Sequence, residues 1–351
     1  MSNLDHSQNA KDRYFMMLAI EQAKLGLYSA RPNPAVGCVI VQAEEVVGQG
    51  FHPKAGQPHA EVFALKDAGI RTVGATAYVT LEPCSHTGRT PPCAKALIES
   101  GVIRVVVAGL DPNPQVAGRG VKLLEQAGIA VSVGVLTTQA EALNKGFLKA
   151  MRNQMPYVRL KIATSLDGRT AMATGESKWI TGPAAREDVQ KLRAQSGAII
   201  TGSETVIVDN PQLNVRSNQL GIAIEEVPHP KAVILDRRCR LKHDLQSDYQ
   251  LSRRPDTLYW REDNLRELLK VLVTEYQCYD VLIEAGASVA GSFLQQQLVD
   301  ELIVYQAPCL LGQKARAMVD INPLSLAQQL RFDIQCHEQL DSDLKLTLLP
   351  I

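Results

Sequence analysis

Apolar and polar positions along the first half of the chain predict strands that alternate with helices. Residues 10–28 carry apolar side chains at helical spacing, and two apolar runs at 36–41 and 46–51 predict the arms of a β-hairpin. Further helices are expected over 59–68, 94–99 and 121–127, and further strands over 75–81, 102–108 and 131–135. This alternation indicates an α/β domain with helices on both faces of a mixed sheet.

The second half repeats the alternation after a break. Residues 134–155 are expected to form a helix and then a linker, so we predict one domain over 1–149 and another over 150–351. Strands are then expected over 157–163, 198–201, 231–236, 281–284 and 302–307, and helices over 183–195, over 265–276 and up to 297. The polar, irregular segments 217–230 and 237–256 are assigned no site.

Composition excludes several classes of protein. The 351 residues suffice for about two domains, and the 45% hydrophobic and 21% charged fractions are ordinary for globular proteins. Basic and acidic side chains number 37 each, which argues against a nucleic-acid binder that relies on bulk charge. The polar N-terminus is not expected to be a signal peptide, and no apolar run is long enough to span a membrane. Seven cysteines without disulfide-framework spacing fit a reducing cytoplasm.

Four residues between Pro58 and Cys93 combine metal-binding and proton-transfer chemistry. His59, Cys84 and Cys93 offer an imidazole nitrogen and two thiolates, which suit a tetrahedral catalytic Zn²⁺ that keeps one position for water. Glu61 follows His59 by two residues and is better placed to carry protons than to bind the metal. His-x-Glu followed by Pro-Cys and a second Cys is the pattern of zinc deaminases.

The spacing of the two cysteines leaves a structural alternative open. Eight residues separate Cys84 from Cys93, whereas the common deaminase form has two. A structural zinc site closed by a fourth ligand, for which His86 is available, would contain the same residues, as would two buried thiols beside an ordinary histidine. Thr-Leu-Glu before the first cysteine and Pro-Pro before the second favour the catalytic interpretation.

A strand, a loop of small residues and a helix start follow one another after Val281. Gly286 and Gly291 would allow backbone N–H groups to approach a phosphate, although the loop lacks the Gly-x-Gly-x-x-Gly fingerprint. Tight packing of helix on sheet explains the same glycines equally well.

Six longer motifs run in order along nearly the whole chain. They are Pro-Asn-Pro-Ala-Val-Gly-Cys-Val, Pro-His-Ala-Glu-Val, Thr-Leu-Glu-Pro-Cys-Ser-His-x-Gly-Arg-Thr-Pro-Pro-Cys, Asp-Pro-Asn-Pro-Gln-Val-Ala-Gly-Arg-Gly, Ser-Leu-Asp-Gly-Arg-Thr-Ala and Gly-Glu-Ser-x-Trp-Ile-Thr. In these motifs the chain resembles the bifunctional deaminase–reductase family of bacterial riboflavin biosynthesis. The resemblance implies an N-terminal cytidine-deaminase-like three-layer α/β/α domain and a C-terminal dihydrofolate-reductase-like α/β domain.

The resemblance also implies two consecutive reactions. The first is zinc-dependent deamination of 2,5-diamino-6-ribosylamino-4(3H)-pyrimidinone 5′-phosphate, in which Glu61 protonates the ring nitrogen and then the departing ammonia. The second is reduction of the ribosyl group by NADPH, which gives 5-amino-6-ribitylamino-uracil 5′-phosphate. A small-molecule substrate, no nucleic-acid or membrane partner and a homo-oligomeric state are expected.

The binding residues are carried over from the family position by position. The deaminase substrate contacts would be Asn33, His52 and Arg89. The cofactor contacts would be Ala163, Trp179, Thr205, Asp209, Gly286, Ala287, Ser288, Val289, Ala290, Gly291 and Ser292. The reductase substrate contacts would be Ser177, Arg193, Leu213, Arg216 and Glu284. On local sequence alone, Trp179 would be a core residue and Arg193 would lie on the solvated face of a helix.

Some features stay undecided. Lys161, Asp209 and Glu284 are all candidates for the proton that follows the hydride. Arg237 stands where the family has a cofactor contact but with a different side chain, so we assign it no role. No acidic residue in the loop 286–292 marks a partner for a ribose hydroxyl, and the sequence does not decide how strictly NADPH is preferred over NADH.

Three other functions compete with that of a bifunctional deaminase–reductase. A nucleic-acid base deaminase shares His-x-Glu and Pro-Cys but is expected to have a basic face and the short Cys-x-x-Cys spacing. A zinc-stabilised nucleotide-binding module without turnover leaves Glu61 without a role. A chain with only one active domain is disfavoured, because both residue sets are intact.

Overall fold

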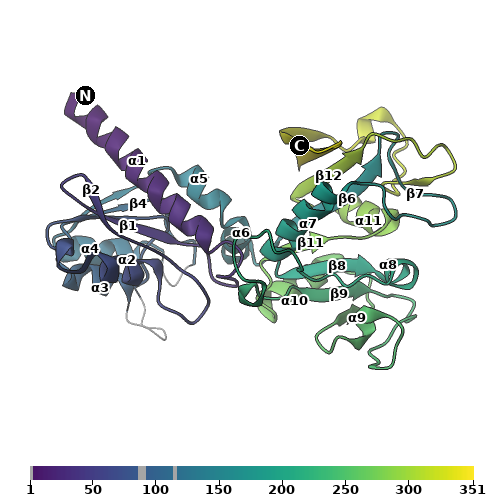
Figure 1. Ribbon diagram of the computed structural model, residues 1–351, viewed down its shortest axis with the longest axis horizontal. Helices are drawn as coiled ribbons and strands as arrows, with labels where there is room; N and C mark the ends of the chain where they lie inside the picture. Colours follow the sequence, from purple (N-terminus) through teal and green to yellow (C-terminus); the bar gives the residue numbers. More distant parts are fainter. Residues whose placement is uncertain (1–2, 86–91, 114–116) are drawn as a thin grey trace. The chain divides into compact units, whose positions relative to one another are not determined.

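The computed structural model describes residues 3–85, 92–113 and 117–351. The chain divides into two compact units, Met1–Asn153 and Gln154–Ile351 (Figure 1). The predicted boundary at residue 150 falls inside helix α6 (Lys145–Asn153), so the expected linker is helical. Leu148 and Ala150 of this helix are buried, which shows that packing decides the conformation of the segment.

The first unit is built on a mixed sheet with the order β2-β1-β3-β4-β5 (Figure 1). Its strands are β1 (Gly37–Gln42), β2 (Glu45–Phe51), β3 (Thr76–Val79), β4 (Arg104–Val107) and β5 (Ala130–Val133). The β1–β2 and β1–β3 pairs are antiparallel, whereas β3, β4 and β5 are parallel to one another. The predicted hairpin and mixed sheet are therefore confirmed.

Helices cover both faces of this sheet, as predicted. One core contains residues of α2 (Ala60–Ala68), α3 (Cys93–Glu99) and α4 (Arg119–Gln126), and another contains residues of α1 (Asn3–Leu25) and α5 (Thr137–Ala142). Successive residues of β1 alternate between the two cores: Cys38 and Ile40 face the first, Val39 and Val41 the second. The short 3₁₀ turn η1 (Gly69–Thr72) follows α2.

Helix α2 lies directly against the backbone of β2. A Cβ atom at Gly48 would come within 2.3 Å of the Ala64 carbonyl oxygen, and one at Gly50 within 2.7 Å of the Ala60 carbonyl oxygen. Only glycine allows such an approach of helix to strand. This contact fixes where α2 begins, and therefore where His59 lies.

A buried ion pair ties α1 to the sheet. Arg104 on β4 donates two hydrogen bonds to the Asp12 carboxylate, at 2.8 and 2.7 Å, and the Tyr78 hydroxyl donates a third at 3.0 Å. Burial by itself would raise the pKa of Asp12, yet the hydrogen bonds and charge of Arg104 bring it below its ordinary value.

The second unit is built on a larger sheet with the order β10-β9-β8-β11-β6-β12-β15-β14. Its strands are β6 (Tyr157–Ser165), β8 (Ala198–Gly202), β9 (Lys231–Leu235), β10 (Leu258–Trp260), β11 (Asp280–Ile283), β12 (Glu301–Ala307), β14 (Phe332–Leu340) and β15 (Asp343–Pro350). The strands from β10 to β12 are parallel, and β15 and β14 add an antiparallel edge. A separate pair joins β7 (Arg169–Ala171) to β13 (Arg316–Ala317).

Helices again pack on both faces. One core includes α7 (Pro183–Gln195) and α8 (Ser203–Asp209), and the other includes α10 (Leu265–Thr274) and α11 (Ala287–Gln295). The remaining short helices are α9 (Gln250–Arg253), η2 (Ile224–Glu226) and η3 (Leu326–Gln328). The parallel sheet with helices on both faces agrees with the predicted α/β class.

The elements that the sequence did not predict include α8, β7, β10, β13, the C-terminal hairpin and the short helices α9, η2 and η3. Residues 203–209 are rich in valine and isoleucine and carry no helical periodicity, so the tertiary environment decides their helical form. The C-terminal hairpin, by contrast, carries a strand signal, because Phe332, Ile334 and Cys336 and then Leu344, Leu346 and Leu348 alternate with polar residues, yet no strand was assigned there.

The structure also describes the cysteines and the length and hydropathy of the helices. All seven cysteines are free thiols; Cys38 and Cys278 are buried, while Cys239 and Cys336 are exposed. Within the described ranges, no helix is both long enough and apolar enough to cross a membrane.

Replacing Asp12 by alanine should destabilise the first unit by about 2–4 kcal/mol, because Arg104 and Tyr78 would lose their shared partner. Since the pKa of Asp12 is lowered in the folded state, its contribution is complete above the ordinary value of 3.8 and disappears as the pH falls through the lower folded-state value. Urea unfolding at neutral and acid pH measures both effects. Lys11→Ala, which breaks an exposed pair with Glu44, is the control. Equal losses in the two variants would contradict the account.

Candidate active sites

Three elements of the first unit bring His59, Cys84 and Cys93 together. His59 immediately precedes α2, Cys84 follows β3 after a short loop, and Cys93 is the first residue of α3. His59 Nδ1 lies 3.2 Å from Cys93 Sγ and 3.7 Å from Cys84 Sγ. The three atoms lie within 4.8 Å of one another, and no other group of this kind occurs in the described parts of the chain.

The donor atoms fit a zinc ion. Bond lengths of about 2.0–2.3 Å in a tetrahedron place nitrogen and sulfur ligands roughly 3.5 Å apart, close to the two distances from His59. His59 is the N-cap of α2 but makes no side-chain capping bond, so its ring is directed to the cysteines. The backbone N–H of Cys93 also donates to Cys84 Sγ at 3.3 Å.

The two cysteines have opposite proton affinities. Hydrogen bonds from the Cys93 thiol and from His59 hold the pKa of Cys84 well below its ordinary value, although burial opposes them. The hydrogen bond to Cys84 and burial raise the pKa of Cys93. The hydrogen bond with Cys84 likewise raises the pKa of His59. The cluster therefore already favours one thiolate, the form that binds metal.

Glu61 lies on the first turn of α2 and is only 3% exposed. Its Oε2 atom is buried without a hydrogen-bond partner among the described residues, and burial raises the pKa of the carboxyl group. A buried carboxylate with an unused oxygen beside three metal-ligating atoms suits proton transfer. Glu61 is not itself part of the ligand cluster.

Asn33 and His52 lie together beside the cluster. Asn33 Nδ2 is 3.0 Å from His52 Nε2, and His52 Nδ1 is 3.1 Å from the Pro58 carbonyl oxygen. Because burial lowers the pKa of His52, the ring is neutral, donating to Pro58 and accepting from Asn33. The His52 ring meets the His59 ring edge-on, with centroids 5.2 Å apart. Arg89 and His86 fall outside the described residues.

Glu82 fixes the loop that precedes α4. Its carboxylate accepts four backbone N–H groups, from Asp111, Gly118, Gly120 and Val121, at 2.9 to 3.3 Å. A Cβ atom at Gly120 would lie 2.0 Å from the Pro83 carbonyl oxygen, so this loop packs directly against the segment that carries Cys84. Glu82 is therefore a loop-fixing residue and not part of the metal-ligating cluster.

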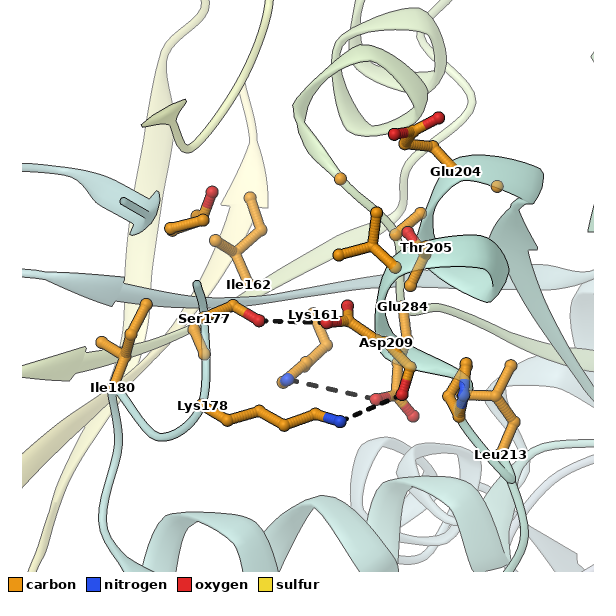
Figure 2. A pocket seen from close by; sticks show the side chains of 18 of the residues that line it. Lys161, Ile162, Ser177, Lys178, Ile180, Glu204, Thr205, Asp209, Leu213 and Glu284 are labelled. Atoms are coloured by element: carbon orange, nitrogen blue, oxygen red, sulfur yellow. Dashed lines mark hydrogen bonds and ion pairs between the residues drawn. The ribbon is translucent and has the colours of Figure 1, made fainter. Parts of the chain in front are cut away.

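The second unit contains a cavity of about 720 Å³ at the carboxyl ends of its parallel strands (Figure 2). Parallel sheets bind ligands at this edge, where the loops after neighbouring strands meet. The predicted residues that line it are Ala163, Ser177, Trp179, Arg193, Thr205, Asp209, Leu213, Arg216, Glu284, Gly286, Ala287, Ser288 and Val289. The loop after β11 thus opens to the cavity, as a phosphate cradle requires.

Three of the predicted cofactor residues do not line the cavity. Ala290, Gly291 and Ser292 continue into α11, where Ala290 and Gly291 are buried. A Cβ atom at Gly291 would come within 2.1 Å of the Asp320 carbonyl oxygen. This glycine therefore serves the tight packing that the sequence offered as the alternative explanation of the loop.

Three charged residues, Lys161, Arg193 and Glu284, line the cavity together. Arg193 binds both oxygens of Glu284, at 2.6 and 2.9 Å, and Lys161 Nζ lies 4.0 Å from Glu284 (Figure 2 shows the lysine and the glutamate). Burial would raise the pKa of Glu284, but the charge and hydrogen bonds of Arg193 lower it. Burial lowers the pKa of Lys161, and Arg193 adds to this effect, although the charge of Glu284 opposes it. Arg193 is only 9% exposed, so the expectation of a solvated helix face is wrong.

A second group of side chains surrounds Asp209. The Ser177 hydroxyl donates to Asp209 Oδ1 at 3.2 Å, and Lys178 Nζ donates to the Asp209 carbonyl at 3.0 Å (Figure 2). Trp179 is 67% exposed and carries the Arg186 guanidinium over its ring at 4.5 Å. The expectation from local sequence that Trp179 is a core residue is therefore wrong.

Sequence reasoning missed several lining residues. They are Thr170, Lys178, Arg186, Glu204 and Arg316. Glu204 belongs to the unpredicted helix α8 and Arg316 to the unpredicted strand β13, so no sequence signal marked either position.

Two protein-family profiles match the chain. The cytidine and deoxycytidylate deaminase zinc-binding region matches residues 9–109, and the RibD C-terminal domain matches residues 156–346. These matches cover the metal-ligating cluster and the cavity, respectively. Together with the geometry, they define a zinc-binding deaminase domain joined to a reductase domain.

Full-length relatives show the same arrangement. Riboflavin biosynthesis protein RibD of Haemophilus influenzae is 49% identical, with 97% of this chain and 98% of the relative covered, and that of Escherichia coli is 47% identical, with 92% and 95% covered. The solved structure of Acinetobacter baumannii RibD matches with a TM-score of 0.93 at 56% identity, covering 98% and 99% of the chains. The chain belongs to the RibD family, the bifunctional deaminase–reductases of riboflavin biosynthesis.

A solved structure of lower sequence identity has the same fold. The diaminohydroxyphosphoribosylaminopyrimidine deaminase/5-amino-6-(5-phosphoribosylamino)uracil reductase of Thermotoga maritima has a TM-score of 0.87 at 32% identity, with 98% of this chain and 100% of that chain covered. The resemblance in the sequence motifs is thus confirmed, and family membership decides against a nucleic-acid base deaminase and a non-catalytic module.

Proposed function

We propose that His59, Cys84 and Cys93 hold one zinc ion, and that Glu61 is the proton carrier of a deamination at this centre. The observation that carries the proposal is the unpartnered, buried oxygen of Glu61 beside three converging donor atoms. When bound, zinc would lower the pKa of a water molecule toward neutrality. Glu61 would accept a proton there, protonate the ring nitrogen and then protonate the departing ammonia.

The proposed substrate of this step is 2,5-diamino-6-ribosylamino-4(3H)-pyrimidinone 5′-phosphate. Asn33 and His52 are held beside the cluster by their mutual hydrogen bond and by Pro58, which supports their assignment as substrate contacts. Arg89 is assigned with them from the family motif. A neutral His52 can orient a ring without adding charge next to a cationic metal.

Replacing Glu61 by glutamine should leave zinc bound and reduce ammonia release by about 10²–10⁴-fold, because the side chain keeps its shape but no longer carries a proton. Zinc content by atomic absorption and ammonia release with the diaminopyrimidine substrate measure the two effects. Glu99→Gln, at an exposed glutamate of α3, is the matched control. Loss of zinc from Glu61→Gln, or ammonia release at the wild-type rate, would contradict the assignment.

We also propose that the cavity of the second unit binds NADPH and the deaminated pyrimidine, and reduces the ribosyl group to ribityl. The residues assigned to the cofactor are Ala163, Trp179, Thr205, Asp209 and Gly286–Ser292. The last three of these do not line the cavity and would act through the residues that do. Ser177, Arg193, Leu213, Arg216 and Glu284 are assigned to the substrate. When bound, the cofactor supplies the hydride, and the protein positions the reactants and moves the proton.

Lys161 is the best placed of the three candidates for proton donation. Glu284 is held as a carboxylate by Arg193, and Asp209 accepts a hydrogen bond from Ser177. Lys161 lines the cavity, and burial lowers its pKa, so it releases a proton more readily than an ordinary lysine. Arg216 is less constrained than Arg193 and is the better candidate for a phosphate contact, since its guanidinium donates to the side chain of neighbouring Asn214, whereas that of Arg193 is held by Glu284.

Lys161→Met should lower kcat for reduction by about 10²-fold or more, because it removes the donor. In the wild type, kcat should fall as the pH rises through the lowered pKa of Lys161, since the protonated form is the active one; the variant should lose this dependence. NADPH oxidation with pre-deaminated substrate across alkaline pH measures both. Lys191→Met, at a half-exposed lysine of α7, is the control. A variant that retains the wild-type pH profile would exclude Lys161 as the donor.

We propose that the enzyme is a cytoplasmic homo-oligomer. The seven free thiols support a reducing compartment. The exposed edge strand β14 offers backbone groups that a second copy could cover. Sedimentation at micromolar concentration should detect species heavier than the 38.4 kDa chain, and a single species of that mass would exclude the oligomer.

A further inference from the structure

The segment over residues 212–217 packs against helix α7. Its odd-numbered residues are buried, and Leu213 shares one hydrophobic core with apolar residues of the helix. Among its even-numbered residues, Gln212 and Arg216 line the cavity of the second unit. This alternation resembles that of a strand, although the segment pairs with no strand in the parts of the chain that the structure describes.

Two polar side chains of α7 hold the backbone of this segment. Gln190 Oε1 accepts the Arg216 N–H at 3.0 Å, and Arg193 Nη1 donates to the Asn214 carbonyl oxygen at 3.2 Å. The two helix residues are three positions apart, so they lie on the same face of α7. Because backbone groups outside a sheet lack a partner on a neighbouring strand, these side chains satisfy them instead.

A third contact fixes the end of the segment. The Ser217 hydroxyl donates to the Glu187 carboxylate and accepts the Gln219 N–H at 2.9 Å. Residues 217, 216 and 214 are thus bonded in turn to residues 187, 190 and 193. The segment therefore runs antiparallel to α7, and this register determines where the Arg216 side chain leaves the backbone.

The two arginines that meet at Asn214 differ in their partners. Glu284 accepts two hydrogen bonds from Arg193, at 2.6 and 2.9 Å, which offsets the charge of that guanidinium. The Arg216 guanidinium donates to the neutral Asn214 side chain at 3.1 Å. Burial lowers the pKa of Arg216, and the charge of Arg193 adds to this effect, although the charge of Glu284 opposes it. An anion in the cavity would therefore be drawn to Arg216.

Gln190 acts from outside the cavity. It is only 6% exposed and is not one of the described residues that line the cavity, whereas Arg216 is. Its hydrogen bond goes to the backbone of Arg216 and not to the guanidinium. Loss of this bond would leave the Arg216 N–H without its acceptor and loosen the position of the side chain, with no direct loss of a ligand contact.

We propose that Gln190 is a positioning residue for phosphate recognition in the reductase: it fixes the backbone of Arg216, whose guanidinium then selects a substrate that carries the 5′-phosphate over one that does not. This inference rests on the proposed reductase function and on the assignment of Arg216 to the substrate phosphate. A side chain that is fixed at its backbone loses less conformational entropy on binding, which favours recognition of a specific group over general charge attraction.

The test compares the pre-deaminated substrate with the same compound lacking its 5′-phosphate, with kcat and KM determined separately from NADPH oxidation. The wild type should have the lower KM for the phosphorylated compound. Gln190→Met keeps the length of the side chain but has no oxygen acceptor. It should raise the KM for the phosphorylated compound by about fivefold or more, the effect expected for one hydrogen bond, and leave kcat and the other KM nearly unchanged. Gln190→Asn withdraws the oxygen by one methylene group and should act in the same direction.

A double-mutant cycle identifies the residue through which Gln190 acts. Arg216→Met should remove most of the preference for the phosphorylated compound, and adding Gln190→Met should then change the preference no further. Gln195→Met makes the same change at the end of the same helix, outside the described lining of the cavity, and is the control. A ratio of two substrates is insensitive to the fraction of enzyme that is folded.

The inference is overturned if Gln190→Met or Arg216→Met keeps the wild-type preference, or if their effects on it add. It is also overturned if Gln190→Met raises the KM equally for both compounds, as general damage to α7 would, or if the wild type has no preference. Oxidation of NADPH with neither compound by the wild type would instead refute the reductase function itself.

Discussion

Both sites depend on one constraint, the alignment of neighbouring parallel strands whose carboxyl ends meet at one edge of a sheet. In the first unit, β3 and β4 end together, and Glu82 joins the segments that follow them by accepting N–H groups from the 111–121 region. In the second unit, β6 supplies Ala163 near its carboxyl end, and the segments after β8, β9 and β11 supply Glu204, Asp236 and Glu284. One architectural rule therefore positions two unrelated sites, a cluster of metal-ligating side chains and the cavity of the reductase domain.

The two sites place a buried carboxylate in opposite environments. In the first, Glu61 is left with an unpartnered oxygen, and burial raises its pKa, which prepares it to exchange protons. In the second, two hydrogen bonds from Arg193 keep Glu284 ionised, and the nearby Lys161, whose pKa burial lowers, would carry the proton in the proposed reduction. A perturbed pKa marks a functional group in both cases, but only the contacts show which group can move a proton.

The sequence predicted much of the fold because most buried elements have a clear periodicity. The hairpin β1–β2, the helix that begins beside His59 and the parallel strands of both sheets except β10 follow from apolar patterns. The metal-ligating cluster could be predicted from motif order. Hairpin β14–β15 was missed although its apolar residues alternate, for example at Leu344, Leu346 and Leu348. Helix α8 and strand β13 could not be predicted, because a β-branched helix and a two-residue strand take their form from neighbours. For that reason Glu204 and Arg316 became visible only in the structure, and the buried pairing of Arg193 with Glu284, separated by 91 positions, could not be read from either segment alone.

The central claim is that one chain carries out two reactions in a fixed order at two separate sites. It is tested most directly by supplying the diaminopyrimidine substrate and NADPH together and following ammonia and NADPH in the same reaction. We expect ammonia release to precede NADPH oxidation with equal final amounts, and zinc removal to stop both while leaving oxidation with pre-deaminated substrate intact. NADPH oxidation without ammonia release, or ammonia release that survives zinc removal, would contradict the account.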